Sequence, residues 1–176
     1  MTSLPRTTLV LGGARSGKSA YAEALIRAAA PIATYLATAE AGDGEMSDRI
    51  AHHRAVRGAG WITIEEPLDL VGTLRRVTRT DRPVLVDCLT LWLSNLMHAE
   101  RDIAAETAAL AACFAGLAGP VVLVSNEVGQ GIVPDNALAR AFRDHAGRLH
   151  QAVAAVADRV VFVTAGLPMA LKSVET

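Results

Sequence analysis

Eight consecutive residues, Gly12 to Ser19, have the types and spacing of a phosphate-binding loop. They read Gly-Gly-Ala-Arg-Ser-Gly-Lys-Ser and fit the pattern G-x-x-x-x-G-K-[ST]. Glycines let successive backbone N–H groups point at one anion, and a following helix adds partial positive charge there. Lys18 can reach the β- and γ-phosphates, and the Ser19 hydroxyl can bind Mg²⁺. The loop predicts binding of a nucleoside triphosphate; the alternative is a glycine-rich turn that contains Lys-Ser by chance.

A second candidate is Asp87, which directly follows the apolar run Val84–Val86. A carboxylate at the end of a buried strand can hold Mg²⁺ through its water shell in a phosphate-loop protein. Aspartate is also a favoured residue at the start of a helix, so a helix cap is the other interpretation. The two roles can coexist.

Polar residues also follow two other apolar runs. Ser125, Asn126 and Glu127 come after Val121–Val124 and before a loop that contains glycines. This trio predicts a third strand end that faces the ligand, and an ordinary turn explains it equally well. Glu65 and Glu66 follow the candidate strand Trp61–Ile64, and either a site role or a solvated surface explains them.

The segment from Glu45 to Arg57 brings histidines and arginines together. If it is helical, Arg49, His53 and Arg57 lie on one face, at positions i, i+4 and i+8. His52 points about 100° away from His53. Two guanidinium groups beside His53 would disfavour the protonated imidazole, and a neutral imidazole can act as a nucleophile. A solvated helix face is the other interpretation.

Short runs of Val, Ile and Leu alternate with helical segments along the chain, which predicts an α/β fold. The alternation implies a mostly parallel sheet with helices on both faces and a ligand at the carboxyl ends of the strands. Residues 1–176 are expected to form a single domain. The candidate strands are Thr8–Leu11, Ile32–Leu36, Trp61–Ile64, Val84–Val86, Val121–Val124 and Val160–Val163, and the candidate helices are Ser19–Ala29, Glu45–Arg57, Leu68–Val77, Leu89–His98, Ile103–Leu117 and Ala137–Ala157.

Composition narrows the class of protein. Seventeen basic and eighteen acidic residues give a formal charge of −1 without a basic stripe, which argues against nucleic-acid binding. The two cysteines, Cys88 and Cys113, suggest reduced and buried thiols rather than a disulfide framework or a metal site. We see no apolar stretch near the roughly 18 residues of a membrane span and no signal peptide, and so expect a cytoplasmic protein.

Taken together and in this order, the motifs resemble one family, the bifunctional adenosylcobinamide kinases and adenosylcobinamide-phosphate guanylyltransferases of cobalamin biosynthesis. The similarity runs nearly from end to end, and the spacing of the block from Asn126 to Arg148 is highly specific. It is carried by Gly12–Ser19, Ala22-Glu23, Tyr35–Ala39, Glu45-Met46, Arg49-Ile50, His53-Arg54, Trp61, Glu65, Asn126–Gly129, Gly131–Pro134, Leu138–Arg140, Phe142–Asp144 and Ala146–Arg148.

The resemblance implies two activities and a fold. The kinase phosphorylates the aminopropanol hydroxyl of adenosylcobinamide with ATP or GTP. The guanylyltransferase passes GMP from GTP, through an enzyme histidine, to adenosylcobinamide phosphate, giving adenosylcobinamide-GDP and pyrophosphate. Members have RecA-like P-loop folds and assemble as trimers, so a homotrimer is expected. Mg²⁺ is the expected cofactor.

Site roles also follow from the resemblance. The family histidine lies in an Arg-Ile-x-x-His pattern, which assigns the covalent role to His53; a shift of one residue would assign it to His52. Lys18 is the other expected catalytic residue, and Ser19 and Asp87 are the expected metal ligands. The implied nucleotide-binding residues are Gly12, Gly13, Ala14, Arg15, Ser16, Gly17, Lys18, Ser19, Ala37, Thr38, Ala39, Arg54, Ala55, Val56, Arg57, Glu65 and Asp87.

Two other functions compete with this one. A monofunctional small-molecule P-loop kinase would need Lys18, Ser19 and Asp87 but would give His53 no covalent role. A RecA-like, ATP-dependent nucleic-acid module would share the sheet pattern but would require a basic surface.

Overall fold

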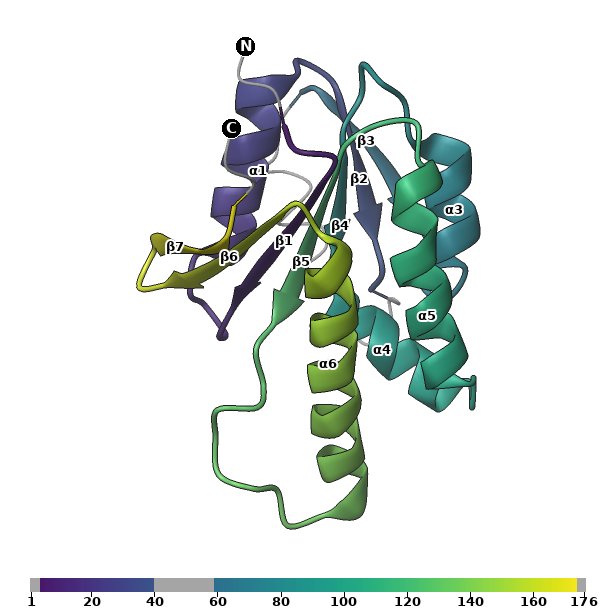
Figure 1. Cartoon of the computed structure of the whole chain (residues 1–176), viewed down its shortest axis with the longest axis vertical. Helices are drawn as coiled ribbons and strands as arrows, with labels where there is room; N and C mark the ends of the chain where they lie inside the picture. The colour runs from purple at the N-terminus through teal and green to yellow at the C-terminus, as the bar shows by residue number, and fades with distance from the viewer. Residues whose placement is uncertain (1–3, 40–58, 174–176) are drawn as a thin grey trace.

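The computed structural model describes residues 4–39 and 59–173, and in these ranges the strands form one seven-stranded sheet (Figure 1). The strand order is β3-β2-β4-β5-β1-β6-β7, and all neighbouring pairs are parallel except β6 and β7. The strands are β1 (Thr7–Gly12), β2 (Ala33–Ala37), β3 (Trp61–Glu65), β4 (Val84–Asp87), β5 (Val121–Asn126), β6 (Arg159–Thr164) and β7 (Leu167–Lys172).

Alternate residues of the central strands pack into two separate cores, because successive side chains of a strand point to opposite faces. One core joins Val10, Leu85 and Val122 to Ala22 and Ile26 of helix α1 (Lys18–Ala29). The other core lies on the opposite face and is covered by the remaining helices (Figure 1). Both faces of the central strands are therefore dry, as their continuous Val and Leu runs predict.

Local capping sets the starts of three of these helices. Side chains of Asp69, Asp102 and Asn136 each accept a hydrogen bond from the backbone N–H three residues later, which satisfies a free N–H of the first turn. The helices on this face are α3 (Leu70–Val77), α4 (Leu89–His98), α5 (Ile103–Cys113) and α6 (Ala137–Val156), with a short 3₁₀ turn, η1, at Phe114–Gly116. None of the helices in the described ranges is both long and apolar enough to cross a bilayer.

The architecture confirms the predicted α/β class and mostly parallel sheet, with two differences, and one predicted helix is left untested. Helix α5 ends at Cys113, four residues before the predicted end, because the chain tightens into η1. Strand β7 was not predicted; it folds back on β6 as an antiparallel edge strand whose residues are all exposed. The predicted helix Glu45–Arg57 lies outside the described residues.

Candidate active site

The ends of β1, β5 and β4 bring the predicted phosphate loop and Asp87 to one edge of the sheet. Gly12 is paired with Asn126 across β1 and β5, and Asp87 is paired with Val124 across β4 and β5. Strand β5 thus lies between the strand that leads into the loop and the strand that ends in Asp87. This carboxyl edge is where open parallel sheets bind their ligands.

The loop that connects β1 to α1 is closely packed at two glycines. A Cβ on Gly12 would lie 2.5 Å from the Ser16 Oγ and 2.5 Å from the backbone oxygen of Val163. Gly17 has a φ of 95°, a left-handed conformation that glycine adopts without strain. The turn between β6 and β7 braces the loop, since the Gly166 N–H donates to the Ser16 carbonyl at 2.8 Å.

Lys18 folds back over the loop. Its Nζ donates to the Gly13 carbonyl oxygen at 2.9 Å, and the side chain is buried. Burial lowers the pKa of Lys18, while the neighbouring Cys88 and Asp87 groups act in the opposite direction. Lys18 and Asp87 therefore interact electrostatically across the end of β5. This places a cation and a carboxylate together beside the phosphate loop.

Asp87 is held by the neighbouring strand β2. The Tyr35 hydroxyl donates to Asp87 Oδ2 at 2.9 Å. Directly after Asp87, the Thr38 hydroxyl donates to the Cys88 carbonyl at 2.7 Å and accepts from the Cys88 N–H at 2.9 Å. The N-cap of α4 is Cys88, without a side-chain cap hydrogen bond, so the interpretation of Asp87 as a helix cap is wrong.

The donor set at this edge fits Mg²⁺. Ser19 supplies a hydroxyl at the start of α1 and Asp87 supplies a carboxylate, and both are hard oxygen ligands. Mg²⁺ keeps several waters and takes one or two protein oxygens together with substrate phosphates, so two protein ligands are sufficient. Within the described residues no group of three or more His, Cys, Asp or Glu side chains forms a metal site of its own.

A network of polar side chains surrounds the end of β5. The Asn126 side-chain amide donates to the Thr90 Oγ1 at 3.1 Å, which ties β5 to α4. On the other face, the Ser125 Oγ lies 2.7 Å from Nε2 of His150 on α6. The Glu127 N–H donates to the Gly12 carbonyl at 3.0 Å, so Glu127 lies directly beside the start of the phosphate loop.

Other predicted residues lie farther along the edge or outside the description. Ala37 is the last residue of β2, and Thr38 and Ala39 follow it. Strands β4 and β5 lie between β2 and β1, and Thr38 contacts the site through Cys88. Glu65 is exposed at the end of β3, paired with Ala37. Outside the described residues lie His52, His53, Arg54, Ala55, Val56 and Arg57.

Sequence reasoning missed three contributors to this edge. Tyr35 lies two residues before Ala37, which pairs with Asp87. Because side chains alternate along a strand, Tyr35 points to the same face of the sheet as Asp87, and strand periodicity could have shown this. Gly166 is a turn glycine whose contact with the loop is invisible without the fold. His150 lies in the middle of a helix, and nothing near it in sequence distinguishes it from a core residue.

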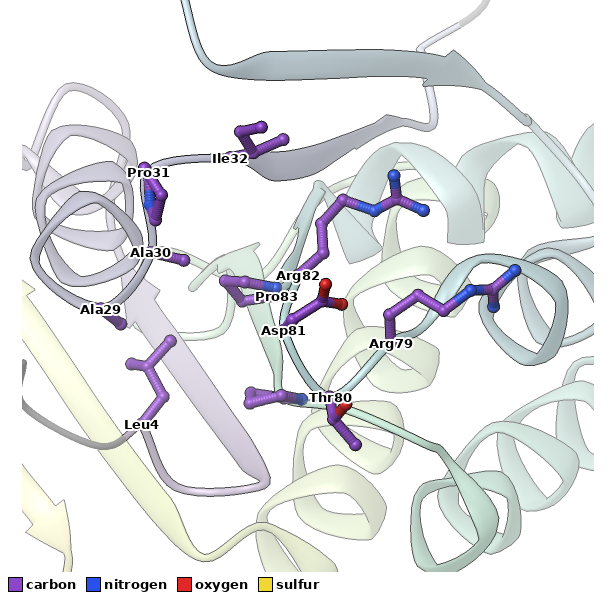
Figure 2. Close-up of a pocket in the computed structure, with 11 residues that line it drawn as sticks. Leu4, Ala29, Ala30, Pro31, Ile32, Arg79, Thr80, Asp81, Arg82 and Pro83 are labelled. Carbon is purple, nitrogen blue, oxygen red and sulfur yellow. The ribbon is translucent and has the colours of Figure 1, made fainter.

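A cavity of about 1000 Å³ lies at the opposite, amino end of the sheet (Figure 2). In Figure 2, Ala29, Ala30 and Pro31 lie on one side of it and the segment from Thr80 to Pro83 lies on the other. Its residues precede strands instead of following them, so it is separate from the phosphate loop.

The chain matches a family model described as cobinamide kinase / cobinamide phosphate guanyltransferase over residues 8–171. It is 53% identical over 166 residues to the bifunctional adenosylcobalamin biosynthesis protein CobP of Pseudomonas aeruginosa, with 93% of this chain and 96% of that protein covered. It is 43% identical over 179 residues to CobU of Salmonella typhimurium, also named a bifunctional adenosylcobalamin biosynthesis protein, covering 93% and 98%.

Solved structures with a similar backbone are RecA-like ATPases. The assembled ATPase EscN of the enteropathogenic E. coli type III secretion system superposes with a TM-score of 0.53 at 11% identity, covering 92% of this chain and 43% of that one. The RadB recombinase superposes with a TM-score of 0.52 at 15% identity, covering 90% and 74%. At these identities the likeness establishes the fold alone, a P-loop NTPase fold of the RecA-like type.

Proposed function

The chain belongs to the cobinamide kinase / cobinamide phosphate guanyltransferase family, and we propose that its phosphate loop serves both reactions. The protein is a bifunctional enzyme of cobalamin biosynthesis. It phosphorylates adenosylcobinamide with ATP or GTP, and it then transfers GMP from GTP to adenosylcobinamide phosphate, giving adenosylcobinamide-GDP and pyrophosphate. The observation that carries the proposal is the buried Lys18, which donates to the loop carbonyl of Gly13 and interacts electrostatically with the carboxylate of Asp87.

In the kinase step, the loop and Lys18 stabilise the charge that develops on the transferred phosphoryl group. On nucleotide binding, Lys18 exchanges its hydrogen bond with the Gly13 carbonyl for phosphate oxygens, which are better acceptors. Backbone N–H groups from Gly13 to Ser19 surround the phosphates at the start of α1. Ser19 and Asp87 would hold Mg²⁺, which when bound neutralises charge on the β- and γ-phosphates.

In the guanylyl transfer, His53 is the proposed nucleophile. Its neutral imidazole attacks the α-phosphorus of GTP and pyrophosphate leaves, so a phosphoramidate to the histidine forms. The phosphate of the acceptor then displaces the histidine and takes the GMP. The support for His53 is the Arg49-Ile50-Ala51-His52-His53 pattern shared with the family, and Arg54 to Arg57 and Glu65 are proposed nucleotide contacts on the same basis.

We also propose the extent of the catalytic domain, the oligomeric state, the cellular compartment and the binding partners. We take residues 1–176 as one catalytic domain, a view supported by the single sheet that holds all the described strands. The proposed assembly is a homotrimer in the cytoplasm, supported by the family resemblance and by the buried, unpaired thiols of Cys88 and Cys113. Adenosylcobinamide, its phosphate and GTP or ATP are the proposed binding partners.

Incubation with α-labelled GTP tests the covalent step. Wild-type protein and His52→Ala should retain label, whereas His53→Ala should retain none and should form no adenosylcobinamide-GDP. Kinase activity should survive in His53→Ala, because γ-phosphoryl transfer to a hydroxyl needs no covalent intermediate. The label should be released by acid, which protonates the P–N nitrogen, and should persist in alkali. Label retained by His53→Ala and lost from His52→Ala would contradict the assignment.

A further inference from the structure

The buried side chains of Ser125 and His150 form a pair that neither proposed reaction uses. Ser125 is fully buried, His150 is 6% exposed, and their Oγ and Nε2 atoms lie 2.7 Å apart. The other ring nitrogen of His150, Nδ1, is buried without a hydrogen-bond partner in the described part of the chain. A buried polar nitrogen without a hydrogen bond costs free energy of folding, so its presence calls for a functional explanation.

Nδ1 of His150 faces the carboxylate of Glu127. The Glu127 Oε2 lies 3.7 Å from Nδ1, slightly beyond hydrogen-bond distance. The other carboxylate oxygen, Oε1, accepts the Gly129 N–H at 2.6 Å. One oxygen of Glu127 therefore anchors its own loop, and the other remains available.

The tautomer of His150 follows from these contacts. Burial lowers the pKa of His150, opposed by Glu127, so the ring is neutral at neutral pH. A carboxylate only accepts hydrogen bonds, so the nitrogen that faces it, Nδ1, carries the proton. Nε2 is then the acceptor, and the Ser125 hydroxyl donates to it. Ser125 thereby fixes the tautomer that presents a donor to Glu127.

Among the described carboxylates at the carboxyl ends of strands, Glu127 lies at the end of the strand nearest β1, which leads into the phosphate loop. It follows β5, the neighbour of β1, and its N–H bonds to the Gly12 carbonyl. Asp87 is the last residue of β4, one strand farther from β1, and it accepts a hydrogen bond from Tyr35. Glu66 follows β3 at the far edge, where Oε1 accepts the N–H groups of Leu68 and Asp69.

We propose that Glu127 is the general base of the kinase step and that His150, held by Ser125, is its positioning residue. This inference rests on the proposed kinase function. The acceptor hydroxyl of adenosylcobinamide passes its proton to Glu127 Oε2 while its oxygen bonds to the γ-phosphorus. The bond from that phosphorus to the β-phosphate oxygen breaks, and its electron pair leaves with ADP or GDP. The side chain of Glu127 is 22% exposed, so solvent takes the proton afterwards.

The second reaction supplies an internal control. Its acceptor is a phosphate that is already ionised, so guanylyl transfer requires no such base. Glu127→Gln should lower the kinase kcat by about 10²–10⁴-fold, the usual contribution of a positioned proton acceptor, with the KM for adenosylcobinamide unchanged. Labelling of the protein by GTP, and GMP transfer to pre-formed adenosylcobinamide phosphate, should remain at the wild-type level. Glu106→Gln on α5 is the matched control and should leave the kinase unchanged.

Variants of His150 separate positioning from packing. His150→Leu should lower the kinase kcat without raising the KM, and His150→Asn, which restores a donor near the Nδ1 position, should recover part of it. His145→Asn, five residues earlier on α6, is the control and should behave as wild type. In ¹⁵N spectra at neutral pH, His150 should be protonated on Nδ1, and Ser125→Ala should weaken that preference.

Three results would overturn the inference. They are an unchanged kinase kcat in Glu127→Gln, an equal loss of both activities in that variant, and an Nε2-protonated His150 in the wild type. A wild-type protein that transfers no phosphate to adenosylcobinamide would instead refute the proposed kinase function on which the inference rests.

Discussion

Replacement of Gly12 by alanine tests whether the close packing of the phosphate loop holds β1 and β6 together. The added Cβ would lie 2.5 Å from the Ser16 Oγ and 2.5 Å from the Val163 carbonyl oxygen, far inside normal contact distance. The serine can rotate away, but the carbonyl belongs to the strand paired with β1, and Gly12 itself pairs with Val163. Relief therefore requires the end of β1 to move away from β6.

Overpacking of this kind costs about 1–3 kcal/mol of unfolding free energy. We expect a lower urea midpoint in Gly12→Ala with an unchanged denaturant slope, together with weaker nucleotide binding measured by titration calorimetry. Gly13→Ala is the stability control, because a Cβ there meets no atom within 4 Å. Adding Ser16→Ala to Gly12→Ala should restore little stability, since the clash with Val163 persists. Equal urea midpoints for Gly12→Ala and wild type would refute the reasoning.

Three further predictions concern the chemistry of the site. Lys18→Ala should reduce the kinase rate by about 10²–10³-fold, since an electrostatic stabiliser of the transferred phosphoryl group is lost; undiminished phosphorylation of adenosylcobinamide would contradict this. Asp87→Asn should shift the Mg²⁺ titration of both activities to higher concentration while circular dichroism stays unchanged, and an unshifted titration would exclude Asp87 as a ligand. Burial raises the pKa of Cys113 to about 11 and also raises the pKa of Cys88, so neither thiol of the native protein should react with iodoacetamide at pH 8, and both should react in urea.

The sequence predicted the phosphate loop because its determinants are local. The glycines, Lys18 and Ser19 lie within eight residues, and the apolar strand before them and the helix after them are readable from side-chain type alone. Asp87 was located for the same reason, at the end of an apolar run. The alternative in which Asp87 is a helix cap was excluded only by the structure, where Cys88 is the N-cap of α4, and the role of Asp87 as a metal ligand stays a prediction.

The contacts that orient the site join residues far apart in the chain. The Tyr35 to Asp87 hydrogen bond spans 52 positions, and the Ser125 to His150 contact spans 25. Such pairs depend on strand order and on which helix covers which face. Alternation of strands and helices leaves that order undetermined, because several right-handed arrangements satisfy the same pattern. Strand β7 escaped prediction for a different reason: all of its residues are exposed, so it has no buried apolar face for a sequence pattern to reveal.

Strand β5 lies between β1 and β4, and this position lets residues at its end distinguish the two acceptors that share one phosphate loop. Lys18 interacts with Asp87 across the end of β5, so the groups that follow β5 lie next to the phosphate site. The loop and Asp87 are common requirements of nucleotide use and do not distinguish a hydroxyl from a phosphate. The end of β5 can distinguish them, because Glu127 there can take a proton that only the hydroxyl acceptor carries. We therefore expect changes at Glu127 to separate the two activities, whereas changes in the phosphate loop impair both.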